Sequence, residues 1–181
     1  SLGRLAKEKN VEALIYYLSM IKLKPYLLIV GDGPNRVHLQ EYVQELGLSD
    51  RVKFTGMIHP DDVAKFYQLG DIFVSASTSE TQGLTYIEAL ASGLPALCRE
   101  DESIDNVIVD GETGYQYNTF KQFESCLYDL VKNKAAHQYM VQTSQDFAVE
   151  NFSSTSFGEH VAKIYERAIT SYAIEQVIQM Q

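Results

Sequence analysis

Positive charge is scarce in this sequence. Its 181 residues include 15 lysines and arginines against 24 aspartates and glutamates, which gives a net charge of −9. A chain that coats nucleic acid is normally basic, so the composition argues against a nucleic-acid partner. It also argues against broad adhesion of this part of the protein to an anionic bilayer, although a local basic patch is compatible with the average.

Cysteine and long apolar runs are scarce as well. The two cysteines, Cys98 and Cys126, lack the spacing of a disulfide framework, which favours reduced thiols and a cytoplasmic location. A zinc site would need more ligands at closer spacing, so no metal is expected. No apolar run approaches the ~20 residues of a membrane-spanning helix, and the opening SLGRLAKEKN has no apolar segment of the kind found in a secretory signal.

Short apolar segments alternate with longer amphipathic ones. We predict strands at 26–30, 52–54, 72–74, 95–98 and 114–117, and helices at 11–20, 35–46, 60–69, 84–92 and 121–132, with most of the remaining chain helical. Strands that are apolar throughout and alternate with helices are typical of an α/β domain in which helices cover both faces of a parallel sheet. Ligands of such sheets bind at the carboxyl ends of the strands, so candidate site residues are sought there.

Two cations lie near the start of the chain. Arg4 follows Gly3, and Lys9 comes shortly before the first predicted helix. A guanidinium group supplies a planar set of donors and an ammonium group a compact charge, which together suit a diphosphate. The alternative is a solvated basic surface before a helix.

Glycines occupy the turn between the predicted strand at 26–30 and the helix that follows it. In Gly31-Asp32-Gly33-Pro34 they permit a tight turn and a close approach of the backbone to a ligand. A simple strand–helix turn is the alternative, and for this motif taken alone it is the favoured one. The stretch is not the dinucleotide fingerprint, because Arg36 stands where its third glycine would be.

The segment from Ser79 to Glu88 has the features of an anion site. Free N–H groups at a helix start, near Gly83, Leu84 and Thr85, can cradle a phosphate. Glu80 precedes this cradle and Glu88 follows it by about one helical turn, so each carboxylate can accept hydrogen bonds from a polyol on its side of the phosphate. The alternative is a pair of glutamates favoured by the helix dipole.

An apolar pair, Met57-Ile58, follows the strand that ends near Gly56. In a loop at the carboxyl end of a strand, such a pair can cover a flat nucleotide base. A loop that faces the core is the alternative.

These motifs together resemble the retaining glycosyltransferases of family 4 with the GT-B fold. The matched motifs are G-R-L-x-x-x-K from Gly3, G-D-G-P, F-x-G, the E-x7-E pair and A-S-G-L-P from Ala91. The resemblance covers nearly the whole chain and implies the C-terminal half of a two-domain enzyme, a Rossmann-like nucleotide-sugar-binding domain over residues 1–181. The run from Phe73 to Pro95 is most similar to bacterial α-monoglucosyldiacylglycerol synthases.

The resemblance implies a role for each matched residue. Glu80 would act on the donor sugar as the catalytic residue, and Glu88 would bind the ribose. The donor-binding set would be Arg4, Lys9, Gly31, Gly33, Ile58, Gln82, Gly83, Leu84, Thr85 and Glu88. The common loop form E-G-F-G-L is replaced here by E-T-Q-G-L, so Thr81 and Gln82 depart from the family pattern.

The implied reaction moves a hexose, expected to be glucose, from a uridine diphosphate sugar to an acceptor such as a diacylglycerol lipid or a glycan. No D-x-D motif is present, so no metal and no further cofactor are expected. The helices from about 152 would pack back toward an N-terminal acceptor domain, without which this chain would be inactive, and the whole enzyme would lie at the inner membrane surface. A non-catalytic nucleotide-binding regulatory domain and a sugar-nucleotide epimerase of the same fold are the alternatives.

Overall fold

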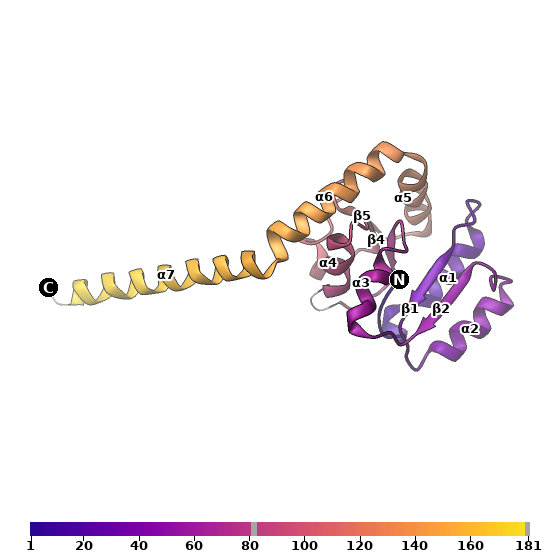
Figure 1. The fold of residues 1–181 in the computed structure, drawn as a ribbon, viewed down its shortest axis with the longest axis horizontal. Helices are drawn as coiled ribbons and strands as arrows, with labels where there is room; N and C mark the ends of the chain where they lie inside the picture. The colour runs from indigo at the N-terminus through magenta and orange to yellow at the C-terminus, as the bar shows by residue number, and fades with distance from the viewer. Residues whose placement is uncertain (81–82, 180–181) are drawn as a thin grey trace.

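The computed structural model describes residues 1–80 and 83–179, and strands alternate with helices through most of it (Figure 1). The strands are β1 (Leu27–Val30), β2 (Val52–Gly56), β3 (Phe73–Ser75), β4 (Ala96–Arg99) and β5 (Gly114–Tyr117). The helices are α1 (Val11–Met20), α2 (Arg36–Glu45), α3 (Val63–Tyr67), α4 (Leu84–Ala91), α5 (Phe120–Lys132), α6 (Lys134–Phe152) and α7 (Ser154–Gln179), with 3-10 turns η1 (Lys7–Lys9), η2 (Pro60–Asp62) and η3 (Glu102–Ile104). Each predicted strand and helix is present, with its bounds shifted by a few residues.

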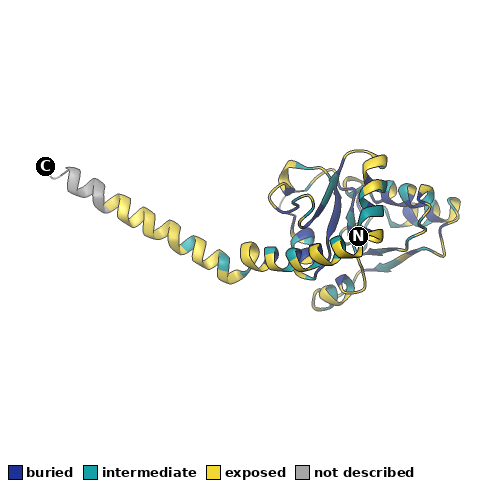
Figure 2. Cartoon of the chain, turned by 90° about the horizontal axis from the view of Figure 1, so that it is seen from above, coloured by how far each residue is buried: buried dark blue, intermediate teal, exposed yellow. Residues whose placement is uncertain are grey.

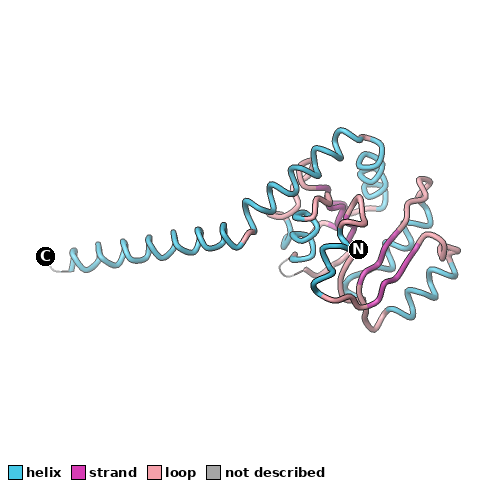
Figure 3. The backbone as a smooth tube through the Cα atoms, viewed as in Figure 1, coloured by secondary structure: helices cyan, strands magenta, loops and turns pink. Residues whose placement is uncertain are grey.

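The strands pair in parallel, as predicted, but they form two sheets rather than one. β1 pairs with β2 (Figure 3). In the second sheet, β4 lies between β3 and β5. The predicted α/β class is therefore confirmed, and the expected single sheet is divided between β1 and β3.

The division has a local cause. Ser1–Gly3 runs beside β1, where Ser1 N donates to Leu28 O, Val30 N to Ser1 O and Gly3 N to Val30 O, but no strand pairing links this stretch to β3 among the described residues. An apolar cavity of about 430 Å³ lies between β1 and β3.

β4 shows that helices cover both faces of the larger sheet. Successive side chains of a strand point to opposite faces. Leu97 belongs to the core formed with α1 and α5, whereas Ala96 and Cys98 belong to the core formed with α4 and α6. Both faces of this strand are thus buried, which explains why its sequence is apolar without alternation.

α7 lies apart from this body. It extends away from the sheets, and most of its described side chains are exposed (Figures 1 and 2). Large apolar side chains are among them: Phe157, Ile164, Tyr165, Ile169 and Tyr172. The predicted packing of this region toward an acceptor domain stays a prediction.

Candidate functional site

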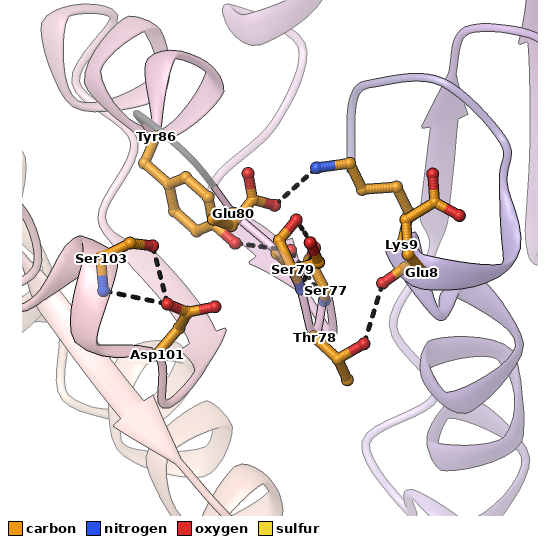
Figure 4. Close-up of polar contacts among 10 residues, drawn as sticks. Glu8, Lys9, Ser77, Thr78, Ser79, Glu80, Tyr86, Asp101 and Ser103 are labelled. Carbon is orange, nitrogen blue, oxygen red and sulfur yellow. Dashed lines mark hydrogen bonds and ion pairs between the residues drawn. The ribbon is translucent and has the colours of Figure 1, made fainter.

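Two loops that are distant in the sequence meet at the carboxyl ends of the strands. The loop after β3 docks on η1, since both the backbone N–H and the hydroxyl of Thr78 bond to the carbonyl of Glu8, at 3.0 and 3.2 Å (Figure 4). This contact fixes the position of Glu80, two residues further on, next to Lys9.

Lys9 and Glu80 form an ion pair. The distance from Lys9 Nζ to Glu80 Oε1 is 2.8 Å, and 9% of the Glu80 side chain is exposed against 30% of that of Lys9 (Figure 4). The lysine charge therefore compensates a carboxylate that is largely withdrawn from water. A diphosphate that enters here must share Lys9 with Glu80 or displace it.

The start of α4 presents backbone donors. Gly83 has the left-handed conformation, with φ 61°, and its carbonyl accepts the N–H groups of Tyr86 and Ile87. Among the described residues, the N–H groups of Gly83, Leu84 and Thr85 have no backbone or side-chain acceptor. Donors of this kind at a helix start form an anion site.

A cavity of about 220 Å³ joins these features. Arg4 and Lys9 line it from one side, and Glu80 with the helix start at Gly83, Leu84 and Thr85 lines it from the other. Unlike Lys9, Arg4 forms no ion pair with the described residues, so its charge is available to an anion. The structure brings these six predicted residues together, and their contacts with a donor stay predictions.

The predicted glycines of the G-D-G-P turn have a structural explanation. A Cβ on Gly31 would lie 2.1 Å from Gly3 O, and one on Gly33 would lie 2.5 Å from Leu5 O. Neither position can hold a side chain, because the backbone of Gly3 lies against Gly31 and that of Leu5 lies against Gly33. The two glycines therefore allow the segment that carries Arg4 to pack against this turn, and neither residue lines the cavity.

The other predicted residues lie outside the cavity lining. Ile58 follows β2 and is partly buried. Gln82 lies outside the described residues. Glu88 is exposed one turn into α4, and its Oε2 lies 3.0 Å from the Tyr67 hydroxyl.

Two further side chains at this end of the sheets were not identified from the sequence. Asp101 follows β4 and accepts from the N–H and the hydroxyl of Ser103, at 2.9 and 2.7 Å (Figure 4). The Ser103 hydroxyl, then the Ser103 N–H, hold the pKa of Asp101 below its usual range. The rule that sites collect at carboxyl ends of strands could have found Asp101. The other residue, Tyr67, looks from the sequence like an ordinary core aromatic.

Tyr67 is buried and bonds into α4. Its hydroxyl lies 3.0 Å from Thr85 O and 3.0 Å from Glu88 Oε2. Burial, followed by the nearby Glu88 charge, raises the pKa of this tyrosine. The hydroxyl is therefore a permanent donor at neutral pH.

Within residues 1–80 and 83–179, no group of three or more His, Cys, Asp and Glu side chains is arranged to hold a metal ion. No helix in the described part of the chain has both the length and the apolarity to cross a membrane.

Two known proteins of the same name resemble this chain in sequence. The chain is 37% identical to the alpha-monoglucosyldiacylglycerol synthase of Streptococcus pneumoniae over 174 residues, which cover 94% of this chain and 39% of that protein. It is 34% identical to the enzyme of the same name from Acholeplasma laidlawii over 135 residues, 73% of this chain and 34% of that protein. The chain thus spans less than half of the length of these relatives.

Solved structures agree on the fold. The structure of Anabaena Alr3699/HepE in complex with UDP superposes with a TM-score of 0.83 at 20% identity, covering 92% of this chain and 47% of that one. Residues 1–166 match the model of the family described as glycosyl transferases group 1. The chain therefore belongs to the group 1 glycosyl transferases, as a C-terminal domain of the GT-B fold.

Proposed function

We propose that this chain is the donor-binding domain of a retaining glycosyltransferase. It would bind a uridine diphosphate sugar with the diphosphate between Arg4, Lys9 and the start of α4. The observation that carries the proposal is the cavity in which two cations, the N–H groups at the start of α4 and the nearly buried Glu80 converge. UDP in a structure of the same fold supports the choice of nucleotide.

The same residues can assist departure of the nucleotide. As the bond from the anomeric carbon to the diphosphate breaks, negative charge grows on the phosphate oxygens and positive charge on the sugar ring. Arg4, Lys9 and the N–H groups near Gly83 line one cavity, which supports a role for them in stabilising the leaving group. We assign this task to protein groups rather than to a metal ion, so transfer should persist in the presence of EDTA.

The two glutamates would bind opposite ends of the donor molecule, the sugar and the ribose. Glu80 lies beside Lys9 at the cavity, on the side proposed for the sugar. Glu88, one turn into α4, would bind the ribose hydroxyls. Departure of a diphosphate needs no general acid, so the pair differs from the two carboxylates of a glycosidase.

The acceptor is proposed from the relatives. Two of them bear the name of a synthase of monoglucosyldiacylglycerol, which supports glucose as the sugar and a diacylglycerol lipid as the acceptor. The acceptor would bind an N-terminal domain, against which the exposed apolar side chains of α7 would pack. The full-length protein would work at the cytoplasmic surface of a membrane, and residues 1–181 alone would not transfer sugar.

One experiment tests donor and acceptor in sequence. The melting temperature of the full-length protein is measured with UDP-glucose, UDP-N-acetylglucosamine and GDP-mannose. The stabilising nucleotide sugar is then incubated with diacylglycerol vesicles, and the lipids are analysed by mass spectrometry. We expect stabilisation by UDP-glucose and formation of a monoglucosyl lipid.

Other outcomes would contradict the proposal. Binding without any product would favour a regulatory nucleotide-binding domain. Conversion of the nucleotide sugar to an isomer without an acceptor would favour an epimerase. Transfer of glucose to another acceptor would support the proposed donor and refute the proposal that the acceptor is a diacylglycerol lipid.

A further inference from the structure

Glu88 is held by a side chain from another part of the chain. Tyr67, the last residue of α3, reaches α4 with its hydroxyl and meets Glu88 Oε2 at 3.0 Å. No other hydrogen bond to the Glu88 carboxylate joins residues that the structure describes. One carboxylate oxygen is thus occupied and the other is open to a ligand.

The hydroxyl proton has two acceptors within reach, Thr85 O and Glu88 Oε2, each at 3.0 Å. A hydroxyl carries one proton, and a carboxylate forms the stronger, charge-assisted hydrogen bond. The proton is therefore directed at Glu88, and the backbone carbonyl of Thr85 is the weaker competitor.

The tyrosine ring cannot move freely. Only 3% of Tyr67 is exposed, and its ring packs on Phe73 of β3 with centroids 5.9 Å apart. Phe73 packs in turn on Tyr86 of α4, at 5.4 Å. A rigid donor therefore contacts the exposed, flexible side chain of Glu88. Holding such a side chain in its binding conformation reduces the conformational entropy lost on binding.

From this contact we infer that Tyr67 is a positioning residue for ribose recognition. It fixes the Glu88 carboxylate so that Oε1 faces the ribose hydroxyls of the nucleotide. The inference rests on the proposed function, because it requires Glu88 to bind ribose. It adds to that function a residue of α3 that does not itself touch the donor.

The test uses the ribose hydroxyls as the variable. Dissociation constants of UDP and of 2′,3′-dideoxyuridine diphosphate are measured by calorimetry with the full-length protein and with Tyr67→Phe, Glu88→Gln and the double variant. Tyr115→Phe is the matched control, since it removes a tyrosine hydroxyl that donates to another carboxylate, Asp129 Oδ2, at 2.8 Å, away from Glu88 and from the donor cavity.

The expected result is a selective loss. Glu88→Gln should remove most of the preference for UDP over the dideoxy nucleotide. Tyr67→Phe should weaken UDP binding by roughly three- to tenfold, the range for part of a charge-assisted contact, and leave the dideoxy nucleotide unaffected. The double variant should bind UDP no more weakly than Glu88→Gln, because the two residues act as one unit. Tyr115→Phe should keep the wild-type preference.

The possible failures can be told apart. If the wild-type protein does not prefer UDP to the dideoxy nucleotide, Glu88 does not bind ribose and the proposed ribose assignment falls with the inference. If Glu88→Gln loses the preference and Tyr67→Phe keeps it, the ribose assignment stands and the positioning role is refuted. If Tyr67→Phe weakens both nucleotides equally, Tyr67 has a structural role only, which also refutes the inference.

Discussion

A substitution at Gly83 tests the anion site, because its effect on the stability of the protein can be measured separately from its effect on nucleotide binding. It is buried at the start of α4 with φ 61°. A Cβ at this position would lie 3.2 Å from Cγ2 of Ile104 and 3.6 Å from the Tyr86 ring. The left-handed conformation costs a non-glycine residue roughly 1–2 kcal/mol, so Gly83→Ala should lower the free energy of unfolding by about that amount.

The same substitution should also impair nucleotide binding. Relief of the strain would rotate the peptide groups that orient the N–H donors of Gly83 and Leu84. A hydrogen bond to a charged group contributes roughly 1.5–3 kcal/mol, so the loss of one should weaken UDP binding by roughly ten- to a hundredfold. Calorimetry with UDP and thermal unfolding without it measure the two effects separately.

Gly111 provides the matched control. It has φ 80°, and nothing lies within 4 Å of a Cβ built on it. Gly111→Ala should therefore have a similar conformational cost and leave UDP affinity unchanged. The reasoning would be refuted if Gly83→Ala bound UDP like the wild type, or if Gly111→Ala weakened binding as much as Gly83→Ala did.

Three further predictions follow from the same geometry. Arg4→Ala and Lys9→Ala should each weaken UDP binding measured by calorimetry. The affinity of the wild-type protein should fall with added salt, because exposed charges are screened. Unchanged affinity in both variants would show that Arg4 and Lys9 are only part of a solvated surface. Glu80→Gln should slow transfer by at least about tenfold, and normal turnover would remove its assignment to the sugar. Donation by the Gly33 N–H, then by Arg36, holds the pKa of Asp32 low, so its stabilisation is present above about pH 3.9 and lost below. Asp32→Asn should accordingly lower the melting temperature at neutral pH and make little difference in strong acid; a pH-independent effect would contradict this.

The α/β class and nearly all elements could be predicted from the sequence, because local patterns determine them. A short apolar run such as that ending at Val30, followed by a glycine, indicates a buried strand of a parallel sheet. A glycine at position 83 marks the start of α4, and the free N–H groups after it follow from helix geometry alone. Glu88 comes four residues after Leu84, which is about one helical turn, so its place on α4 could be predicted as well. Glu80 precedes the helix start.

Contacts between distant segments could not be predicted in this way. The sequence gives no sign that Lys9 pairs with Glu80, since the contact depends on docking of the loop after β3 onto η1 through Thr78 and Glu8. The sequence offers a ligand loop or a strand–helix turn for the glycines at 31 and 33, and only the structure shows that the backbone of Gly3 and Leu5 lies against them.

The division of the sheet and the role of Tyr67 depend on tertiary structure for the same reason. Strand order is set by which edges meet in space, and the stretch beside β1 bonds to that strand alone. Tyr67 has the burial and spacing of any core aromatic, and the contact of its hydroxyl with Glu88 arises only from the packing of α3 near α4. Local pattern thus determined the elements and the positions of the candidate anion-binding groups, whereas packing decided which charges pair and which carboxylate is held.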